Sequence, residues 1–286
     1  MTTTVTAGEL LRWARTQDPA LKPAHARILL AHLTGQSADF LFTHSNYAVP
    51  SEAVRVFKEQ AQDLMNGVPL SRITGEREFW SLPFLLNEDT LDPRPDSETL
   101  IESVLAHMPD RQAPLKILDL GTGTGCLLIS LLTELPNATG VGVDISPKAL
   151  EAAQENASRH LEEGRATFVL SHWFEKLTGT FDLIISNPPY IPRKDYENLA
   201  PEVLHQDPER ALVAGDDGLD CYRDIIKNAP AFLKPGGALA LEIGIHQTQA
   251  VSDLLTRHEF ALENAYKDLS GIDRCLISSY DIADIL

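Results

Sequence analysis

Short apolar runs and helical patterns alternate along the chain from Lys116 onward, and this alternation constrains the fold more than any other feature of the sequence. The runs have the length and composition of buried strands, and the stretches between them have the apolar spacing of helices. Strands joined by crossover helices build an α/β sheet. We therefore predict a mostly parallel seven-stranded sheet with strands at 116–120, 139–144, 166–170, 181–186, 238–243, 260–266 and 274–280, and with helices at 126–135, 147–160, 219–233 and 247–258.

The first 70 residues carry helical patterns and little else. Thr6 followed by Glu9 is a capping-box pattern that predicts the start of a helix. Apolar stripes at helical spacing follow, and Gly35 and Gly67 end the second and third of them. We predict three segments: a small N-terminal α-helical bundle at 1–70, a connector with a β-hairpin near 78–86 at 71–98, and the α/β domain at 99–286.

Net charge and cysteine spacing limit the kinds of substrate and binding site that this chain can have. Asp and Glu number 41 against 24 Lys and Arg, the formal net charge is −17, and the sequence has no run of basic residues. Such a chain repels phosphate backbones, so nucleic acid is not expected as a substrate. The cysteines are far apart and form no CxxC pair, so we expect neither a metal site nor a disulfide framework from Cys126, Cys221 and Cys275. No apolar stretch reaches the ~18 residues of a membrane span and the first residues lack a signal-peptide pattern, so we expect a cytoplasmic protein with no membrane partner.

A glycine-rich turn joins the first strand of the α/β domain to its first helix, and it consists of Gly121, Thr122, Gly123, Thr124 and Gly125. Glycine lets the backbone approach a ligand closely. The pattern matches neither the dinucleotide fingerprint nor a Walker loop, which leaves an adenosine ligand without a diphosphate open. Asp144 ends the next strand, where a carboxylate can accept hydrogen bonds from ribose hydroxyls. The alternative is that Gly121–Gly125 form a tight turn and Asp144 caps the following helix, with no ligand bound at either place.

The strand at 181–186 runs directly into Asn187-Pro188-Pro189-Tyr190. Two prolines stiffen the turn and leave its carbonyls free to accept hydrogen bonds. The Asn187 side chain and the Pro188 carbonyl supply acceptors for the two hydrogens of a planar NH2 group, and Tyr190 offers a face on which that group can stack. These residues therefore indicate a site for an amide or aromatic amine nitrogen, with a rigid loop that merely ends the strand as the alternative.

Together, the glycine loop, Asp144 and the tetrapeptide resemble the class I S-adenosyl-L-methionine (SAM) methyltransferases that methylate amino groups on planar systems. Adenine-N6 DNA methylases, guanine-N2 rRNA methylases and protein-glutamine methylases share the tetrapeptide. Further motifs resemble the peptide chain release factor glutamine N5-methyltransferases (PrmC/HemK), at Gly75–Trp80, Thr90–Glu98, Trp173–Phe174, Ala211–Val213, Asp217–Leu219, Leu241–Gly244 and Leu269–Arg274.

The resemblance implies a Rossmann-like SAM methyltransferase domain. It implies transfer of a methyl group from SAM to the side-chain amide nitrogen N5 of the glutamine in the GGQ motif of class 1 release factors, with S-adenosyl-L-homocysteine as the other product. The glycine loop, Asp144 and Trp173 would bind SAM, and Asn187 would touch both cofactor and glutamine. The implied catalytic residues are Asn187, Pro188 and Tyr190, and Pro189 completes the glutamine pocket. The helical bundle would recognise the release factor.

Several points stay open at this stage. Asp92 stands where the family usually has an apolar residue, and Ser171-His172 stands where Gly-Asp is common, so a cofactor contact from position 172 is undecided. The roles of Arg94, Glu98 and Glu242 are undecided between pocket and scaffold. The alternative functions are a ribosomal protein L3 glutamine methyltransferase, a DNA or RNA amino-methyltransferase, and a SAM-binding module without activity.

Overall fold

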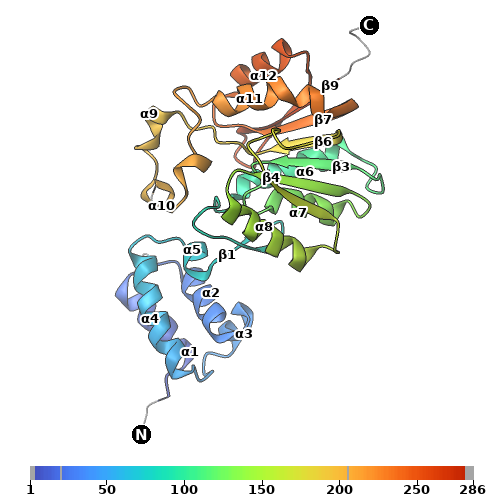
Figure 1. The fold of residues 1–286 in the computed structure, drawn as a ribbon. Helices are drawn as coiled ribbons and strands as arrows, with labels where there is room; N and C mark the ends of the chain where they lie inside the picture. Colours follow the sequence, from blue (N-terminus) through green and yellow to red (C-terminus); the bar gives the residue numbers. More distant parts are fainter. Residues whose placement is uncertain (1–3, 20, 205, 281–286) are drawn as a thin grey trace. The chain divides into compact units, whose positions relative to one another are not determined.

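The computed structural model describes residues 4–19, 21–204 and 206–280. It divides into two compact units, Met1–Gly75 and Glu76–Leu286, whose elements are labelled in Figure 1. Each unit has its own hydrophobic core. The two units are therefore described separately.

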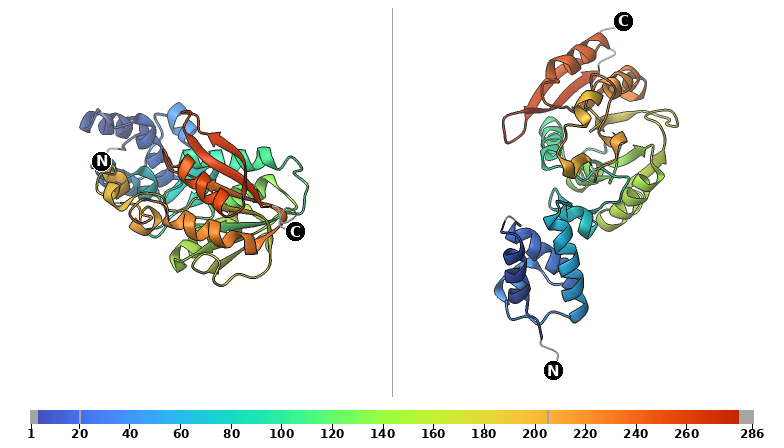
Figure 2. Two further views of the ribbon diagram at one scale, coloured as in Figure 1. Left: turned by 90° about the horizontal axis from the view of Figure 1, so that it is seen from above. Right: turned by 90° about the vertical axis from the view of Figure 1, so that its left-hand side faces the viewer.

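The first unit is a bundle of helices, seen most clearly in the right-hand view of Figure 2. Its first helix begins with a capping box, in which the Thr6 backbone N–H donates to Glu9 Oε2 at 2.8 Å and the Thr6 hydroxyl accepts from the Glu9 N–H. Leu29, Leu30 and Phe57 are fully buried in the core of the bundle. The helices are α1 (Ala7–Gln17), α2 (Pro23–Thr34), α3 (Ala38–Thr43), α4 (Ser51–Met65) and α5 (Leu70–Thr74), of which α3 and α5 are too short to give a clear sequence pattern.

The second unit starts with the hairpin of β1 (Glu76–Phe79) and β2 (Leu82–Leu85), whose strands pair antiparallel. Phe79 and Phe84 point from this hairpin into the core of the second unit, where both are almost completely buried. An extended stretch then leads through the 3-10 turn η1 (Pro95–Ser97) into helix α6 (Glu98–His107). The hairpin and this stretch therefore belong to the second unit.

The remainder of the second unit is the predicted seven-stranded sheet, with the strand order β5-β4-β3-β6-β7-β9-β8. The first five strands in that order are parallel, and β9 is antiparallel to both of its neighbours. The prediction of a mostly parallel sheet is confirmed. The strands are β3 (Lys116–Leu120), β4 (Thr139–Asp144), β5 (Ala166–Leu170), β6 (Phe181–Ser186), β7 (Leu233–Glu242), β8 (Ala261–Lys267) and β9 (Asp273–Tyr280).

Helices cover both faces of the sheet (Figures 1 and 2). Successive strand residues point to opposite faces, so Leu183 and Ile185 pack under α6 and α7 while Ile184 packs under α11 and α12. The predicted helix at 219–233 ends early because Pro230 cannot continue it, and a 3-10 turn η3 (Ala229–Phe232) leads into β7. The helices are α7 (Cys126–Glu134) and α8 (Pro147–His160) on the α6 side, and α11 (Asp220–Asn228) and α12 (Thr248–Arg257) on the other.

An excursion of the chain follows β6, and its described residues, 187–204 and 206–219, form short helical turns. Its two ends meet, since Ile191 and Val213 form an isolated bridge and the Ile191 N–H donates to the Leu212 carbonyl at 2.9 Å. Its elements are α9 (Arg193–Tyr196), α10 (Pro201–Leu204) and η2 (Glu209–Ala211). None of the helices in the described ranges is long and apolar enough to cross a membrane.

Candidate active site

A cavity of about 340 Å³ lies in the second unit, where β3, β4 and β6 end. The chain proceeds from β3 to β4 on one side and returns to β6 on the other, so the order of strands reverses at this point. Open α/β sheets bind their ligands at such a position. Predicted site residues that line the cavity are Gly121, Thr122, Gly123, Thr124, Asp144, Trp173, Asn187 and Pro189, whereas Gly125, Pro188 and Tyr190 lie next to it and are not part of its wall.

The glycine loop needs glycine because of both backbone conformation and space. Gly121, Gly123 and Gly125 all have positive φ angles, 71°, 54° and 79°, which other residues adopt only with strain. A Cβ on Gly125 would lie 2.9 Å from Cδ1 of Ile129 and 3.3 Å from Cβ of Ala153. Gly125 therefore allows α7 and α8 to approach each other, while Gly121–Thr124 form the wall of the cavity.

The indole of Trp173 lies against the glycine loop. A Cβ on Gly121 would be 3.5 Å from Cζ3 of Trp173, which is an ordinary packing distance. Trp173 itself has a φ of 43°, an uncommon backbone conformation for a large side chain. Strained residues of this kind cluster at ligand sites, where the surrounding structure holds them in place. The indole thus offers an apolar surface directly beside the loop.

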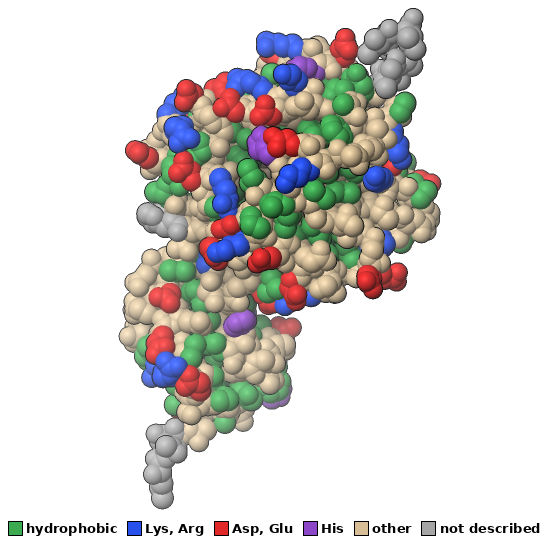
Figure 3. All heavy atoms as spheres, in the orientation of Figure 1, with side chains coloured by type: hydrophobic (Ala, Val, Ile, Leu, Met, Phe, Trp, Pro, Cys, Tyr) green, Lys and Arg blue, Asp and Glu red, His purple; other side chains and the backbone are tan. Residues whose placement is uncertain are grey.

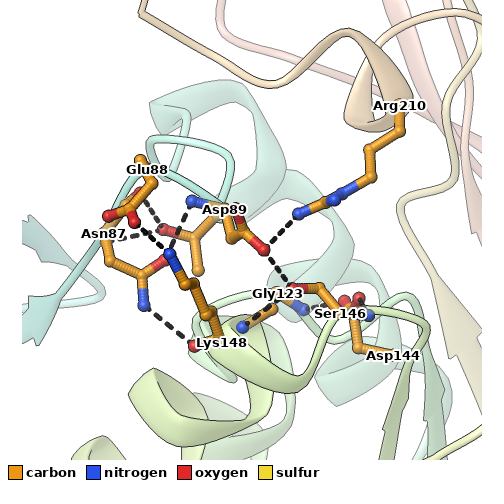
Figure 4. Close-up of polar contacts among 10 residues, drawn as sticks. Asn87, Glu88, Asp89, Gly123, Asp144, Ser146, Lys148 and Arg210 are labelled. Carbon is orange, nitrogen blue, oxygen red and sulfur yellow. Dashed lines mark hydrogen bonds and ion pairs between the residues drawn. The ribbon is translucent and has the colours of Figure 1, made fainter.

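Asp144 is fixed by two backbone donors at the end of β4 (Figure 4). Oδ2 accepts from the Gly123 N–H at 2.9 Å, and Oδ1 accepts from the Ser146 N–H at 2.9 Å. Burial raises the pKa of Asp144, and the two backbone hydrogen bonds oppose that shift. Since a carboxylate has about four acceptor positions, two remain for hydroxyl groups of a ligand in the cavity.

A polar network at the edge of the cavity was not predicted from the sequence (Figure 4). Asp89 Oδ2 accepts from the Ser146 hydroxyl at 2.5 Å and pairs with the Arg210 guanidinium at 2.5 Å. Next to it, Lys148 pairs with Glu88 at 2.5 Å. The network joins the stretch before η1, the start of α8 and the excursion after β6. Asp89 and Arg210 directly precede the family motifs at 90–98 and 211–213, which was the only available signal.

Asn187 lies at the junction of the cavity with the buried end of the sheet. Its Nδ2 donates to Oγ of Ser97 at 3.1 Å. Tyr190 ends the tetrapeptide, and its carbonyl accepts from Nε2 of Gln247 at 2.9 Å. Burial raises the pKa of Tyr190, so its phenol stays neutral. The structure thus brings Asn187 and Pro189 to the cavity that the glycine loop and Asp144 also line.

Two buried carboxylates stand behind the cavity wall. Asp119, at 0% exposure, accepts from the Thr122 hydroxyl at 2.6 Å, and burial together with the nearby Asp144 raises its pKa to about 7. Glu242, at 2% exposure, ends β7, and burial raises its pKa to about 7 as well. Both carboxylates therefore change charge near neutral pH.

The charged residues before α6 form specific pairs. Arg94 pairs with the buried Asp207 of the excursion. Asp96 pairs with Arg274 of β9 at 3.0 Å, and Arg274 also contacts Asp268 at 2.9 Å. Arg94 in addition lines the cavity. These pairs fix the wall on the side of Asn187.

The remaining open positions also have definite places. Glu98 accepts from the Trp80 backbone N–H at 2.9 Å, which ties the hairpin turn to the start of α6. Asp92, the departure from the family pattern, is buried, lies 3.7 Å from Nε of Arg77 and donates its N–H to Asp207 at 3.1 Å. Ser171 and His172, the second departure, both line the cavity.

The arrangement can hold an adenosyl group and a planar amide side by side. Asp144 ends β4 and Trp173 follows β5 on one side of β3, and Asn187 follows β6 on the other side. In the described part of the chain, no group of three or more His, Cys, Asp or Glu side chains is placed to hold a metal ion. On the face drawn in Figure 3, Lys and Arg side chains are interspersed with Asp and Glu and do not gather into one patch.

Comparisons with known proteins cover both units. A family described as a methyltransferase domain matches residues 112–276, and one described as the PrmC N-terminal domain matches residues 7–75. A release factor glutamine methyltransferase of Rhodospirillum rubrum is 43% identical over 88% of this chain and 77% of its own length. One of Agrobacterium fabrum is 41% identical over 95% of this chain and 94% of its own. Among solved structures, a methyltransferase of Pyrococcus furiosus has a TM-score of 0.54 at 17% identity, covering 79% of this chain and 99% of that one, which bears on the fold alone.

Proposed function

The chain belongs to the family of release factor glutamine methyltransferases, and we propose that it methylates the side-chain amide nitrogen N5 of the glutamine in the GGQ motif of class 1 release factors, using SAM. The observation that carries the proposal is the position of Asn187, whose side chain reaches the same cavity as the glycine loop and Asp144. Release factors act on the ribosome, so this substrate places the reaction in the cytoplasm.

The residues of the cavity fit SAM. Asp144 keeps acceptor positions for the two ribose hydroxyls, the indole of Trp173 packs beside Gly121 of the loop, and the wall between them is largely apolar. When bound, SAM supplies a methyl group on a sulfonium that is already activated for transfer. The protein's own contribution is therefore to bind, to orient and to exclude water.

The substrate amide is the partner that needs positioning. Its nitrogen is a poor nucleophile because its lone pair is delocalised, so holding nitrogen, carbon and sulfur in line can contribute up to ~7–11 kcal/mol. In this proposal Oδ1 of Asn187, which lines the cavity, and the carbonyl of Pro188, which lies next to it, accept the two hydrogens of the NH2 group, and the ring of Tyr190 is the surface on which that group would stack. These hydrogen bonds strengthen as positive charge builds on the nitrogen. No residue is assigned as a general base, and the proton leaves to water after transfer.

The helical unit, Met1–Gly75, is proposed to grip the release factor. It matches the PrmC N-terminal domain and lies outside the SAM cavity, every wall residue of which belongs to the second unit. A protein substrate needs a contact area far larger than a single glutamine pocket. In the domain division proposed from the sequence, 1–70 recognises the release factor, 71–98 is the connector, and 99–286 is the methyltransferase domain.

One assay tests the proposal. The protein is incubated with SAM labelled in its methyl group and, in separate reactions, a release factor, the same factor with its GGQ glutamine changed to alanine, ribosomal subunits and DNA. We expect label in the intact release factor alone. Label in ribosomal subunits, or in DNA, would instead favour the ribosomal protein or the nucleic acid alternative.

A substitution tests the carrying residue. Asn187→Ala removes the acceptor for the amide hydrogens, and we expect it to raise the barrier to methyl transfer by roughly 2–4 kcal/mol, as for other lost transition-state hydrogen bonds. The measurement is single-turnover transfer to the release factor at saturating SAM. Asn228→Ala, the same change at an exposed site on α11, is the matched control. Turnover of Asn187→Ala within a factor of three of the parent would remove Asn187 from the proposal.

A further inference from the structure

A small polar group is buried behind Asn187 and consists of Ser97, Asn187 and Glu242. Ser97 is 3% exposed and Glu242 is 2% exposed. Strands β6 and β7 are parallel, with Ser186 opposite Leu241, so the next residues, Asn187 and Glu242, lie side by side. By alternation along each strand both side chains point to the face that α6 covers. Ser97 ends the 3-10 turn η1 and directly precedes α6.

The Ser97 hydroxyl contacts Asn187 and does not cap helix α6. Serine at the N-cap of a helix usually accepts from the helix's own backbone, which contributes about 1 kcal/mol. The Ser97 side chain makes no such bond, and its Oγ accepts from Nδ2 of Asn187 at 3.1 Å. Ser97 has a helical backbone conformation (φ −68°, ψ −15°) that continues the preceding 3-10 turn, so its hydroxyl is not placed to cap α6 and contacts Asn187 instead.

Glu242 is the third member, and its burial is otherwise unexplained. Its carboxyl group is close enough to the Ser97 hydroxyl and the Asn187 amide that both oppose the rise of its pKa on burial. Its second oxygen, Oε2, has no hydrogen-bond partner within the described ranges. A buried carboxylate with an unused oxygen is destabilising. The other charged or titratable groups acting on it are Arg274, Asp96, Tyr190, Tyr222, Cys126 and Cys275.

We propose that Glu242 is a positioning residue for Asn187: together with Ser97 it takes up the hydrogens of Nδ2, so that Oδ1 is the atom presented to the substrate carboxamide. An asparagine amide has nearly the same shape in its two orientations, and only its partners decide which one is adopted. An ionised carboxylate accepts and never donates, so it selects the orientation with Nδ2 inward. This inference rests on the proposed function and deepens it.

The chemistry predicts what happens when Glu242 becomes able to donate. A protonated Glu242, or a glutamine at this position, can donate to Oδ1 and turns Nδ2 toward the substrate. Two NH2 groups would then face each other without an acceptor between them. Because burial raises the pKa of Glu242 to about 7, the fraction of the carboxylate that is ionised grows as the pH rises through this value. The rate of methyl transfer should therefore rise with pH through about 7.

Kinetics of Glu242→Gln test this directly. We expect kcat to fall about 10–100-fold at pH 8, an amount typical of losing a partner that orients a functional side chain, with unchanged SAM affinity. The rise of the rate through pH 7 should disappear in Glu242→Gln and persist in Glu242→Asp. The matched control is Glu98→Gln, the same change one residue from Ser97, where an amide oxygen still accepts from Trp80. Full activity of Glu242→Gln, or an unchanged pH profile, would overturn the inference.

A second readout needs no substrate. The side-chain NH2 signals of Asn187 are assigned in 15N-labelled protein by their loss in Asn187→Ala. We expect them to shift with pH near 7 in the parent and in Glu242→Asp, and to be insensitive to pH in Glu242→Gln. If these signals titrate but no release factor is methylated, the proposed function fails and the positioning role stands. If the release factor is methylated but the Asn187 signals show the same pH dependence in the parent and in Glu242→Gln, the positioning role is wrong and the proposed function stands.

Discussion

Replacing Asp144 with asparagine tests two roles of this side chain, which are to accept backbone N–H groups and to bind the ribose of SAM. Its carboxylate oxygens each accept one backbone N–H, from Gly123 and from Ser146, both at 2.9 Å. An asparagine keeps one oxygen, so one of these N–H groups faces an NH2 group and loses its acceptor. The ribose also loses a charged acceptor. Asp144→Asn should therefore weaken SAM binding while the strand and helix around it stay in place.

The magnitude follows from the kind of bond that is lost. A hydrogen bond to a charged group contributes about 1.5–3 kcal/mol, which corresponds to a roughly 10–150-fold higher Kd for SAM. Stability of the free protein should change little. Because burial raises the pKa of Asp144, the free protein already disfavours the charged form that the substitution removes.

Titration calorimetry with SAM provides the measurement. In the parent the affinity should fall as the pH drops toward the raised pKa of Asp144, since the protonated acid is a weaker acceptor, and Asp144→Asn should show no such dependence. Glu88→Gln is the matched control, because Glu88 belongs to the adjacent network and does not line the cavity. A Kd within threefold of the parent in Asp144→Asn would refute the assignment of the ribose to this residue.

Two further predictions concern stability. Asp119→Asn keeps an oxygen for the Thr122 hydroxyl and removes a buried charge. Because the pKa of Asp119 rises from 3.8 to about 7 on folding, the variant should have a higher free energy of unfolding than the parent, by an amount that grows between about pH 4 and pH 7 and stays constant above. Urea titrations should show a difference of at most about 4 kcal/mol. A gain that is the same at pH 4 and pH 8 would contradict this. Arg94→Ala removes the guanidinium from the buried Asp207 and should lower the free energy of unfolding by about 1–3 kcal/mol, a range reduced because the Arg94 side chain is 36% exposed, and should speed amide exchange at 206–214. Arg193→Ala, which breaks an exposed pair with Glu209, should cost less than about 1 kcal/mol. Equal effects of the two substitutions would show that burial of Asp207 does not matter here.

The sequence predicts the strands of the sheet well for a physical reason. Strands β3, β4, β5 and β6 begin and end where their apolar runs do, and β3 and β6 are buried from both faces, so composition alone marks them. The helix predicted at 219–233 was too long because Pro230 outweighs the apolar spacing around it. Local chemistry thus decides what forms along the chain.

Some parts of the candidate site could likewise be predicted from local sequence, and others could not. The glycine loop, Asp144 and Asn187 are visible in the sequence because each directly follows a strand, and in a parallel sheet the carboxyl ends of strands share one edge. The contact of Asn187 with Ser97 spans 90 positions, and the pair of Asp89 with Arg210 joins segments just as remote. Such contacts depend on which strands are neighbours, and no local pattern encodes strand order. Glu242 could therefore be named from the sequence but not placed.

The order of the strands also decides when the protein becomes active as it is synthesised. Strand β9 is the last strand along the described chain, yet it inserts between β7 and β8. Until it has left the ribosome, β7 exposes an unpaired edge beside Glu242 and β8 has no neighbour. Arg274, carried by β9, then arrives to pair with Asp96. Nascent chains that lack β9 should therefore leave the wall of the cavity beside Asn187 unfinished, so the site forms only after this strand has emerged from the ribosome.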